Sequence, residues 1–194
     1  MDFSRFISES RKIRENSFRY GAYPITEEEA LIMYTVVFER AVILKGLNIV
    51  EVGSGCGYSG IWFLKALKDS GYLNNSQMVM IEQNRTRSKI IRDTVKKLGF
   101  SDYVIVKTGD AKEILRTIRF PINVVFIDAA KHEYHIYLKL LEPNLVSGSI
   151  VFAHNYGGVY SYSMKKYAEM IMDRSKYISS PLPTPLSLAI SIKR

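Results

Sequence analysis

The sequence predicts an α/β fold, a doubly wound and mostly parallel sheet whose last strand is antiparallel. Two observations indicate this fold. Short apolar runs alternate along the chain with helix-like segments, which is the pattern of strands joined by crossover helices. One run, at residues 48–52, leads directly into a turn with glycine at positions 53, 55 and 57. Such a turn at the carboxyl end of a strand is where open α/β sheets bind nucleotides.

The first 45 residues are expected to form helices ahead of the sheet. Residues 1–20 have the pattern of a basic amphipathic helix, which Gly21-Ala-Tyr-Pro24 interrupts. Thr26 and Glu29 form a capping box, which starts a helix predicted to run to about Ile43. We expect one domain over 1–194, with an α/β core at 46–194.

The core is predicted to hold parallel strands separated by helices. A helix near 163–173 precedes Tyr177, a proline-rich turn and a final apolar segment at 186–192. We expect this ending to form a hairpin at one edge of the sheet, with the last strand antiparallel. The predicted parallel strands lie near residues 48–52, 77–81, 103–107, 122–127 and 149–153.

Length and composition limit the class of protein. The chain of 194 residues, 47% apolar and 24% charged, is typical of one globular core. It has no apolar run of 18 residues, and its first residues lack the apolar stretch of a signal peptide. The single cysteine, Cys56, cannot form an internal disulfide, and we interpret it as a packing residue. We therefore expect a cytoplasmic protein with no membrane partner.

The net charge of +8 is concentrated at residues 85–97. A basic face of this kind can bind nucleic acid. Apolar residues at 90, 91, 95 and 98 also give this segment the stripe of an ordinary sheet-covering helix. A solvated outer helix face is the favoured interpretation, with nucleic acid as the less favoured partner.

The glycine turn can be aligned in two frames. Residues 55–60 fit the dinucleotide pattern G-x-G-x-x-G, but Gly53 and Glu51 then occupy positions that should be apolar. The frame E-x-G-x-G-x-G fits better and resembles the first motif of class I S-adenosylmethionine (SAM) methyltransferases. This resemblance puts Glu82, at the end of the next strand, at the ribose-binding position. A turn without a ligand is the alternative, but three alternate glycines are rare in a solvated loop.

Polar side chains follow the strands predicted at 122–127 and 149–153. Asp128 and Lys131 follow the first, and His154 and Asn155 follow the second. Because the carboxyl ends of parallel strands share one rim, these side chains can converge beside the bound nucleotide. Carboxylate, imidazole and amide groups can all bind metals, and Lys131 can act as a base. Alternatively, His154 and Asn155 cap the next turn and Lys131 lies on the surface.

With these motifs, the chain from about residue 25 to 194 resembles the cation-dependent O-methyltransferases of the catechol and caffeoyl-CoA type. The shared features are D-x-x-K at 128–131, the C-G-Y-S turn at 56–59, the Gly109-Asp110 pair and the ending at 181–192. The resemblance implies a seven-stranded sheet and transfer of the SAM methyl to an oxygen of a small molecule, a phenol or vicinal diol. A homodimer is considered as well. The resemblance assigns cofactor binding to Glu51, Gly53, Gly55, Gly57, Tyr58, Ser59, Glu82, Asp110 and Asp128.

In that family, two aspartates and an asparagine hold a divalent cation, and the lysine of D-x-x-K deprotonates the acceptor. The corresponding ligands here are Asp128, His154 and Asn155, and the catalytic residues are Lys131 and Asp128. His154 replaces an aspartate, which removes a hard oxygen ligand and favours Mn, Fe, Co or Zn over Mg²⁺, or no metal. Thr184-Pro185 replaces an acidic-glycine turn.

Two other functions remain open at this point. One is an RNA or protein methyltransferase that uses the basic surface, although the sequence lacks an Asn/Asp-Pro-Pro-aromatic motif after the fourth strand. The other is a SAM-binding protein whose catalytic site has decayed. Its only support is that His154 replaces the aspartate of the family.

Overall fold

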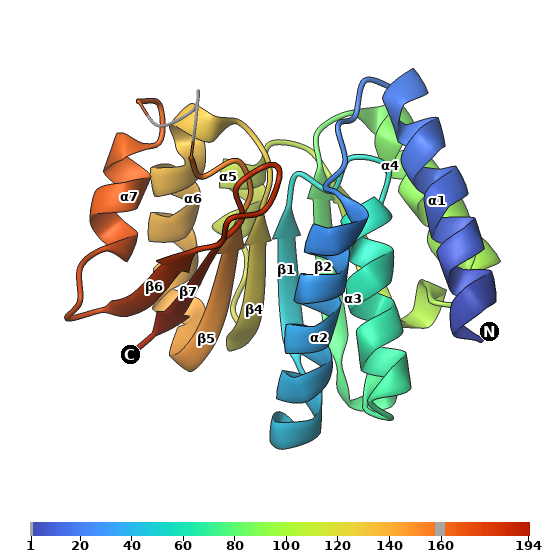
Figure 1. Cartoon of the computed structure of the whole chain (residues 1–194), viewed down its shortest axis with the longest axis horizontal. Helices are drawn as coiled ribbons and strands as arrows, with labels where there is room; N and C mark the ends of the chain where they lie inside the picture. Colours follow the sequence, from blue (N-terminus) through green and yellow to red (C-terminus); the bar gives the residue numbers. More distant parts are fainter. Residues whose placement is uncertain (1, 158–161) are drawn as a thin grey trace.

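A sheet of seven strands forms the middle layer of the molecule, and the computed structural model describes residues 2–157 and 162–194 (Figure 1). The strands are β1 (Asn48–Val52), β2 (Gln77–Glu82), β3 (Val104–Thr108), β4 (Ile122–Ile127), β5 (Leu145–Ala153), β6 (Tyr177–Pro181) and β7 (Ala189–Lys193). Their order across the sheet is β3-β2-β1-β4-β5-β7-β6. Strands β1 to β5 pair in parallel, and β7 pairs antiparallel with β5 and β6. The predicted fold class is confirmed.

Helices cover both faces of the sheet (Figure 1). They are α1 (Phe3–Arg19), α2 (Glu27–Leu44), α3 (Tyr58–Asp69), α4 (Arg85–Lys97), α5 (Ala111–Leu115), α6 (Tyr134–Leu141) and α7 (Lys165–Ile171). Apolar residues of α2, α3 and α4 form one core with the sheet, and those of α5, α6 and α7 form a second core on the other face. Helix α1 packs against α3 on the outer side (Figure 1).

Neighbouring strand residues face opposite cores. In β1, Ile49 belongs to the core with α2 and α3, and Val50 belongs to the core with α5 and α6. Because both faces are covered, the strands read as near-continuous apolar runs, which is why the sequence located them well. Within the described ranges, no helix is long and apolar enough to cross a membrane.

The rim at the carboxyl ends of the parallel strands positions the candidate site. The strand order reverses between β1 and β4, and ligands bind in the crevice that such a switch point creates. The segment that joins α1 to α2 lies at the same edge of the sheet (Figure 1), and residues 21–25 line the cavity there. The site is therefore framed by the sheet rim and by the N-terminal helices.

Two strands, β5 and β7, begin several residues away from their expected starts. β5 begins at Leu145, earlier than predicted, because the polar residues around Gly148, at φ +81°, interrupt its apolar pattern. β7 begins at Ala189 rather than Leu186, because Ser187, at φ +60°, lies in the turn that precedes it. Neither difference changes the topology.

Candidate active site

The glycine turn after β1 follows a backbone path that favours glycine. Gly53, Gly55 and Gly57 have positive φ values of +88°, +54° and +92°. A Cβ on Gly53 would lie 2.2 Å from the backbone oxygen of Asp128, so the close approach of the loop after β4 requires this glycine. Gly57 is the N-cap residue of α3. Of the three glycines, Gly53 and Gly55 line the cavity.

The acidic residue of β1 lies beneath this turn. The Glu51 side chain is buried, and its Oε1 accepts a hydrogen bond from the Ser59 hydroxyl of α3. Its Oε2 has no hydrogen-bond partner among the described residues. Burial raises the pKa of Glu51 to about 7. Glu51 therefore supports the turn from below, whereas Ser59 and the buried Tyr58 belong to the cavity wall.

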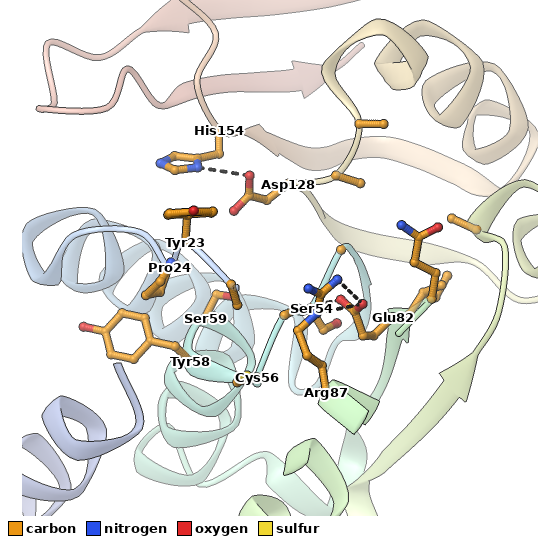
Figure 2. A pocket seen from close by; sticks show the side chains of 18 of the residues that line it. Tyr23, Pro24, Ser54, Cys56, Tyr58, Ser59, Glu82, Arg87, Asp128 and His154 are labelled. Carbon is orange, nitrogen blue, oxygen red and sulfur yellow. Dashed lines mark hydrogen bonds and ion pairs between the residues drawn. The ribbon is translucent and has the colours of Figure 1, made fainter. Parts of the chain in front are cut away.

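Glu82 ends β2 and directs its carboxylate toward the glycine turn. Its Oε2 accepts from the backbone N–H of Gly55 at 2.9 Å, and its Oε1 accepts from the backbone N–H of Asn84 at 2.8 Å. Arg87 donates from Nη2 to the same Oε1 at 2.7 Å (Figure 2). The sequence predicts the basic residues of α4 on a solvated face. Arg87 differs, because it pairs with Glu82 and lines the cavity.

A cavity of about 820 Å³ opens in front of these residues. This volume suits a nucleotide-sized cofactor together with a small second molecule. The predicted Asp110 lies at its rim, where it is half exposed and N-caps α5 by accepting from the Lys112 N–H. Opposite Glu82, the cavity wall continues into the loop after β4 and the end of β5.

Asp128 and Lys131 lie together in that loop, as the D-x-x-K spacing predicted. The Lys131 ammonium donates to Asp128 Oδ1 at 2.7 Å and to the Tyr134 hydroxyl at 2.8 Å. The Tyr134 hydroxyl donates to the backbone oxygen of His154 at 3.2 Å. Burial alone would raise the pKa of Asp128, but His154 and Lys131 together lower it. The pair lines the cavity, so its polar groups can reach a bound molecule.

The His154 ring lies between two carboxylates. Its Nδ1 is 3.1 Å from Asp128 Oδ1, and its Nε2 is 3.3 Å from Glu29 Oε2 (Figure 2 shows the first contact). Neither nitrogen forms a well-aligned hydrogen bond with a described residue, so these are ion-pair contacts. Burial alone would lower the pKa of His154, but the two carboxylates outweigh it and raise the pKa to about 9.

Glu29 is a site residue whose sequence context indicates only a helix cap. The predicted capping box is present, since Thr26 Oγ1 accepts from the Glu29 N–H and Glu29 accepts from the Thr26 N–H. The same carboxylate also accepts from the Thr184 hydroxyl at 2.7 Å and contacts His154. Its side chain is fully buried. Burial would raise the pKa of Glu29, but these contacts lower it to about 2.

The three predicted metal ligands do not fit a divalent cation in this arrangement. Both nitrogens of His154 face carboxylates, although a histidine that binds a metal must offer a lone pair. Asn155, at φ +55°, turns its side-chain amide to the backbone oxygen of Leu186 at 3.3 Å. Within the described ranges, no three His, Cys, Asp or Glu side chains are grouped to hold a metal ion.

Together, fold and site define a class: an α/β protein whose cavity, at the switch point of a parallel sheet, suits a nucleotide-like cofactor. The chain matches the family described as Methyltransferase domain over residues 50–156. It therefore belongs to the methyltransferase domain family, which confirms the class predicted from the glycine turn. The matched segment runs from β1 through Asp128, Lys131 and His154.

Individual relatives agree with this family. A catechol O-methyltransferase from Niastella koreensis is 28% identical over 123 residues, which is 59% of this chain and 52% of that protein. An O-methyltransferase from Bacillus cereus in complex with SAH has a TM-score of 0.80 at 18% identity, covering 96% of this chain and 91% of that one. The O-methyltransferase TomG from Streptomyces achromogenes, in complex with SAM, has a TM-score of 0.78 at 19% identity, covering 95% and 88%. This chain spans 52% to 60% of the length of the curated relatives that it matches.

Proposed function

We propose that the protein transfers the methyl group of SAM to an oxygen of a small molecule, a phenol or a vicinal diol. One observation carries this proposal: the cavity has a nucleotide-type wall, the glycine turn with Glu82, and faces it with the Asp128–Lys131 pair. The relatives named as O-methyltransferases support oxygen as the accepting atom.

The residues of the nucleotide-type wall suit SAM. Gly53 and Gly55 expose backbone at the cavity surface, and the Glu82 carboxylate can accept hydrogen bonds from ribose hydroxyls. Arg87 already donates to Glu82 Oε1, so a bound ribose would share this oxygen with the guanidinium. When bound, SAM supplies a methyl group activated by a sulfonium for in-line displacement.

The opposite wall holds the residues that would deprotonate the acceptor hydroxyl. Lys131, once it has lost its own proton, can accept the proton of the acceptor hydroxyl and so make the oxygen nucleophilic. Asp128 and the Tyr134 hydroxyl hold the Lys131 nitrogen in place through contacts of 2.7 and 2.8 Å. Because the donor set of Asp128, His154 and Asn155 does not fit a cation, no step is assigned to a metal.

A nucleic-acid acceptor is less well supported, because several basic side chains of α4 have partners within the protein. Arg87 pairs with Glu82, and Arg92 donates to the backbone oxygen of Val106 at 2.9 Å. Lys97 pairs with Glu9 of α1 at 2.6 Å. These contacts favour a structural role for much of the basic face.

The test is a transfer screen with methyl-labelled SAM over catechols, simple phenols and total RNA, each with EDTA and with a series of divalent metals. We expect label in catechols or phenols and none in RNA. Lys131→Met should lower transfer about a hundredfold or more, because it removes a general base. The same variant should bind SAM as the wild type does.

The exposed Lys139→Met on α6 is the matched control and should transfer like the wild type. Label that enters RNA and no small molecule would contradict the proposal. SAM binding without transfer to any acceptor would indicate a decayed site instead.

A further inference from the structure

Glu29 lies in the first turn of α2, outside the segment that matches the methyltransferase family. A fully buried carboxylate is costly unless hydrogen bonds and opposite charge compensate it. Glu29 has both, because Thr26 and Thr184 donate to it and His154 faces it at 3.3 Å. Several separate segments of the chain therefore converge on one side chain.

The charges of this cluster balance only when His154 is an imidazolium. Glu29 and Asp128 supply two negative charges, and Lys131 supplies one positive charge at 2.7 Å from Asp128. Among the described residues, the other titratable group within ion-pair distance of either carboxylate is His154, whose side chain is 2% exposed. A neutral ring would leave one buried carboxylate without a counter-charge, which is strongly unfavourable.

Each of the two ring nitrogens of His154 also contacts a carboxylate oxygen. A neutral imidazole has one N–H and one lone pair, and the lone pair would then face a carboxylate oxygen at 3.1 or 3.3 Å. An imidazolium carries a proton on both nitrogens and places its positive charge between the two carboxylates, which fits the ion-pair contacts on both sides of the ring. In that state the ring has no lone pair to offer a metal.

We propose that Glu29 is a positioning residue that holds His154 as a fixed imidazolium against Asp128, so that the site contains its own cation and needs no divalent metal. The proposal rests on the methyl-transfer function argued above. Glu29 then has a role beyond its helix cap. His154 has a role in the site, whereas in a decayed metal site it would have none.

The fixed imidazolium affects the proposed base through Asp128. The Oδ1 atom of Asp128 contacts both Lys131 Nζ and His154 Nδ1. Because the imidazolium also contacts Asp128 Oδ1, it weakens the hold of this carboxylate on the Lys131 proton, and Lys131 loses that proton to solvent more readily before it accepts one from the acceptor. Without the imidazolium, Asp128 would hold Lys131 as an ammonium ion.

The first experiment uses the wild-type protein and needs no acceptor. Nitrogen-15 NMR of its three histidines, with the His154 signal identified by its loss in His154→Gln, should show two protonated ring nitrogens at pH 7.5. Calorimetric titration with MgCl₂ and MnCl₂ should show no saturable binding. A neutral His154 ring, or either metal bound with a Kd below about 1 mM, would overturn the proposal.

The second experiment removes only the charge of Glu29. Glu29→Gln keeps the shape of the side chain and can keep the capping box, because glutamine also serves at this position. We expect His154 to become neutral, transfer to catechol to fall about tenfold or more, and SAH (S-adenosylhomocysteine) binding to change by less than about twofold. Glu28→Gln, on the exposed side of the same turn, is the matched control and should change neither the His154 signal nor transfer.

The outcomes separate this inference from the function on which it rests. If wild type transfers methyl groups and Glu29→Gln leaves both the His154 signal and transfer unchanged, the role of Glu29 is wrong and the function stands. If wild type binds no SAM, the function is wrong, whereas the NMR and metal titrations still decide the state of His154. Should Glu29→Gln fail to fold, the two wild-type measurements remain decisive.

Discussion

The two walls of the cavity are built in different ways. The nucleotide-type wall, or cofactor wall, comes from one turn and the end of the adjacent strand. Its geometry depends on backbone conformation at Gly53 and Gly55 and on one carboxylate, Glu82. The opposite wall, or acceptor wall, is assembled from separate segments of the chain, and it depends on charge balance among Glu29, His154 and Asp128. A local motif can specify the first wall, whereas the second exists only in the folded chain.

The largest effect is expected where the two walls meet. Gly53→Ala adds a Cβ only 2.2 Å from the backbone oxygen of Asp128, at a φ of +88° that disfavours any side chain. We expect a loss of about 3 to 5 kcal/mol in the free energy of unfolding, measured by urea denaturation. Gly71→Ala is the matched control, because Gly71 has a similar φ of +83° but open space around it, and it should lose only about 1 to 2 kcal/mol. Equal losses in the two variants would show that the walls do not constrain each other.

A substitution of intermediate effect, Glu82→Ala, should change the cofactor wall and leave the acceptor wall unchanged. Glu82→Ala removes the carboxylate that faces the glycine turn and should weaken SAM and SAH binding by about 2 to 3 kcal/mol, measured by calorimetry. The charge state of His154 should stay as in the wild type, because Glu82 belongs to the other wall. The exposed Glu113→Ala serves as the control. Unchanged SAM affinity in Glu82→Ala would mean that the ribose is anchored elsewhere.

The smallest effect tests the support beneath the cofactor wall. The pKa of Glu51 is about 7, above its ordinary value of 4.5, so the fold favours the protonated form. Its contribution to stability is complete below pH 4.5 and is lost as the pH rises through 7. Relative to Glu51→Gln, wild type should therefore lose about 2 kcal/mol of unfolding free energy between pH 5 and pH 7. Parallel pH profiles of the two proteins in thermal or urea denaturation would contradict the assigned pKa.

The sequence predicted the parts of the molecule that local pattern determines. The strands at 48–52 and 122–127 lie where their apolar runs indicated, because a sheet covered on both faces leaves continuous runs. Asp128 and Lys131 meet because they are only three positions apart in the sequence.

The residues that the sequence did not reveal depend on contacts between distant segments. Glu29 and Thr184 are 155 residues apart in sequence, and the capping box already gave Glu29 a sufficient local explanation. Arg87 resembled its basic neighbours, and only the position of Glu82 distinguishes it from them. The orientation of Asn155 depends on the turn at Leu186, which lies in another part of the chain.

The double use of Glu29 links the reactivity of the protein to the local stability of one helical turn. Because the same carboxylate closes the capping box of α2 and faces His154, transient fraying of that turn would remove one counter-charge of the proposed imidazolium. Inactivation by heat should then follow hydrogen exchange of the backbone amide of Glu29, and precede the loss of the sheet. Reversible fraying of the first turn of α2 would therefore lower the rate of methyl transfer as well as the local stability of the helix.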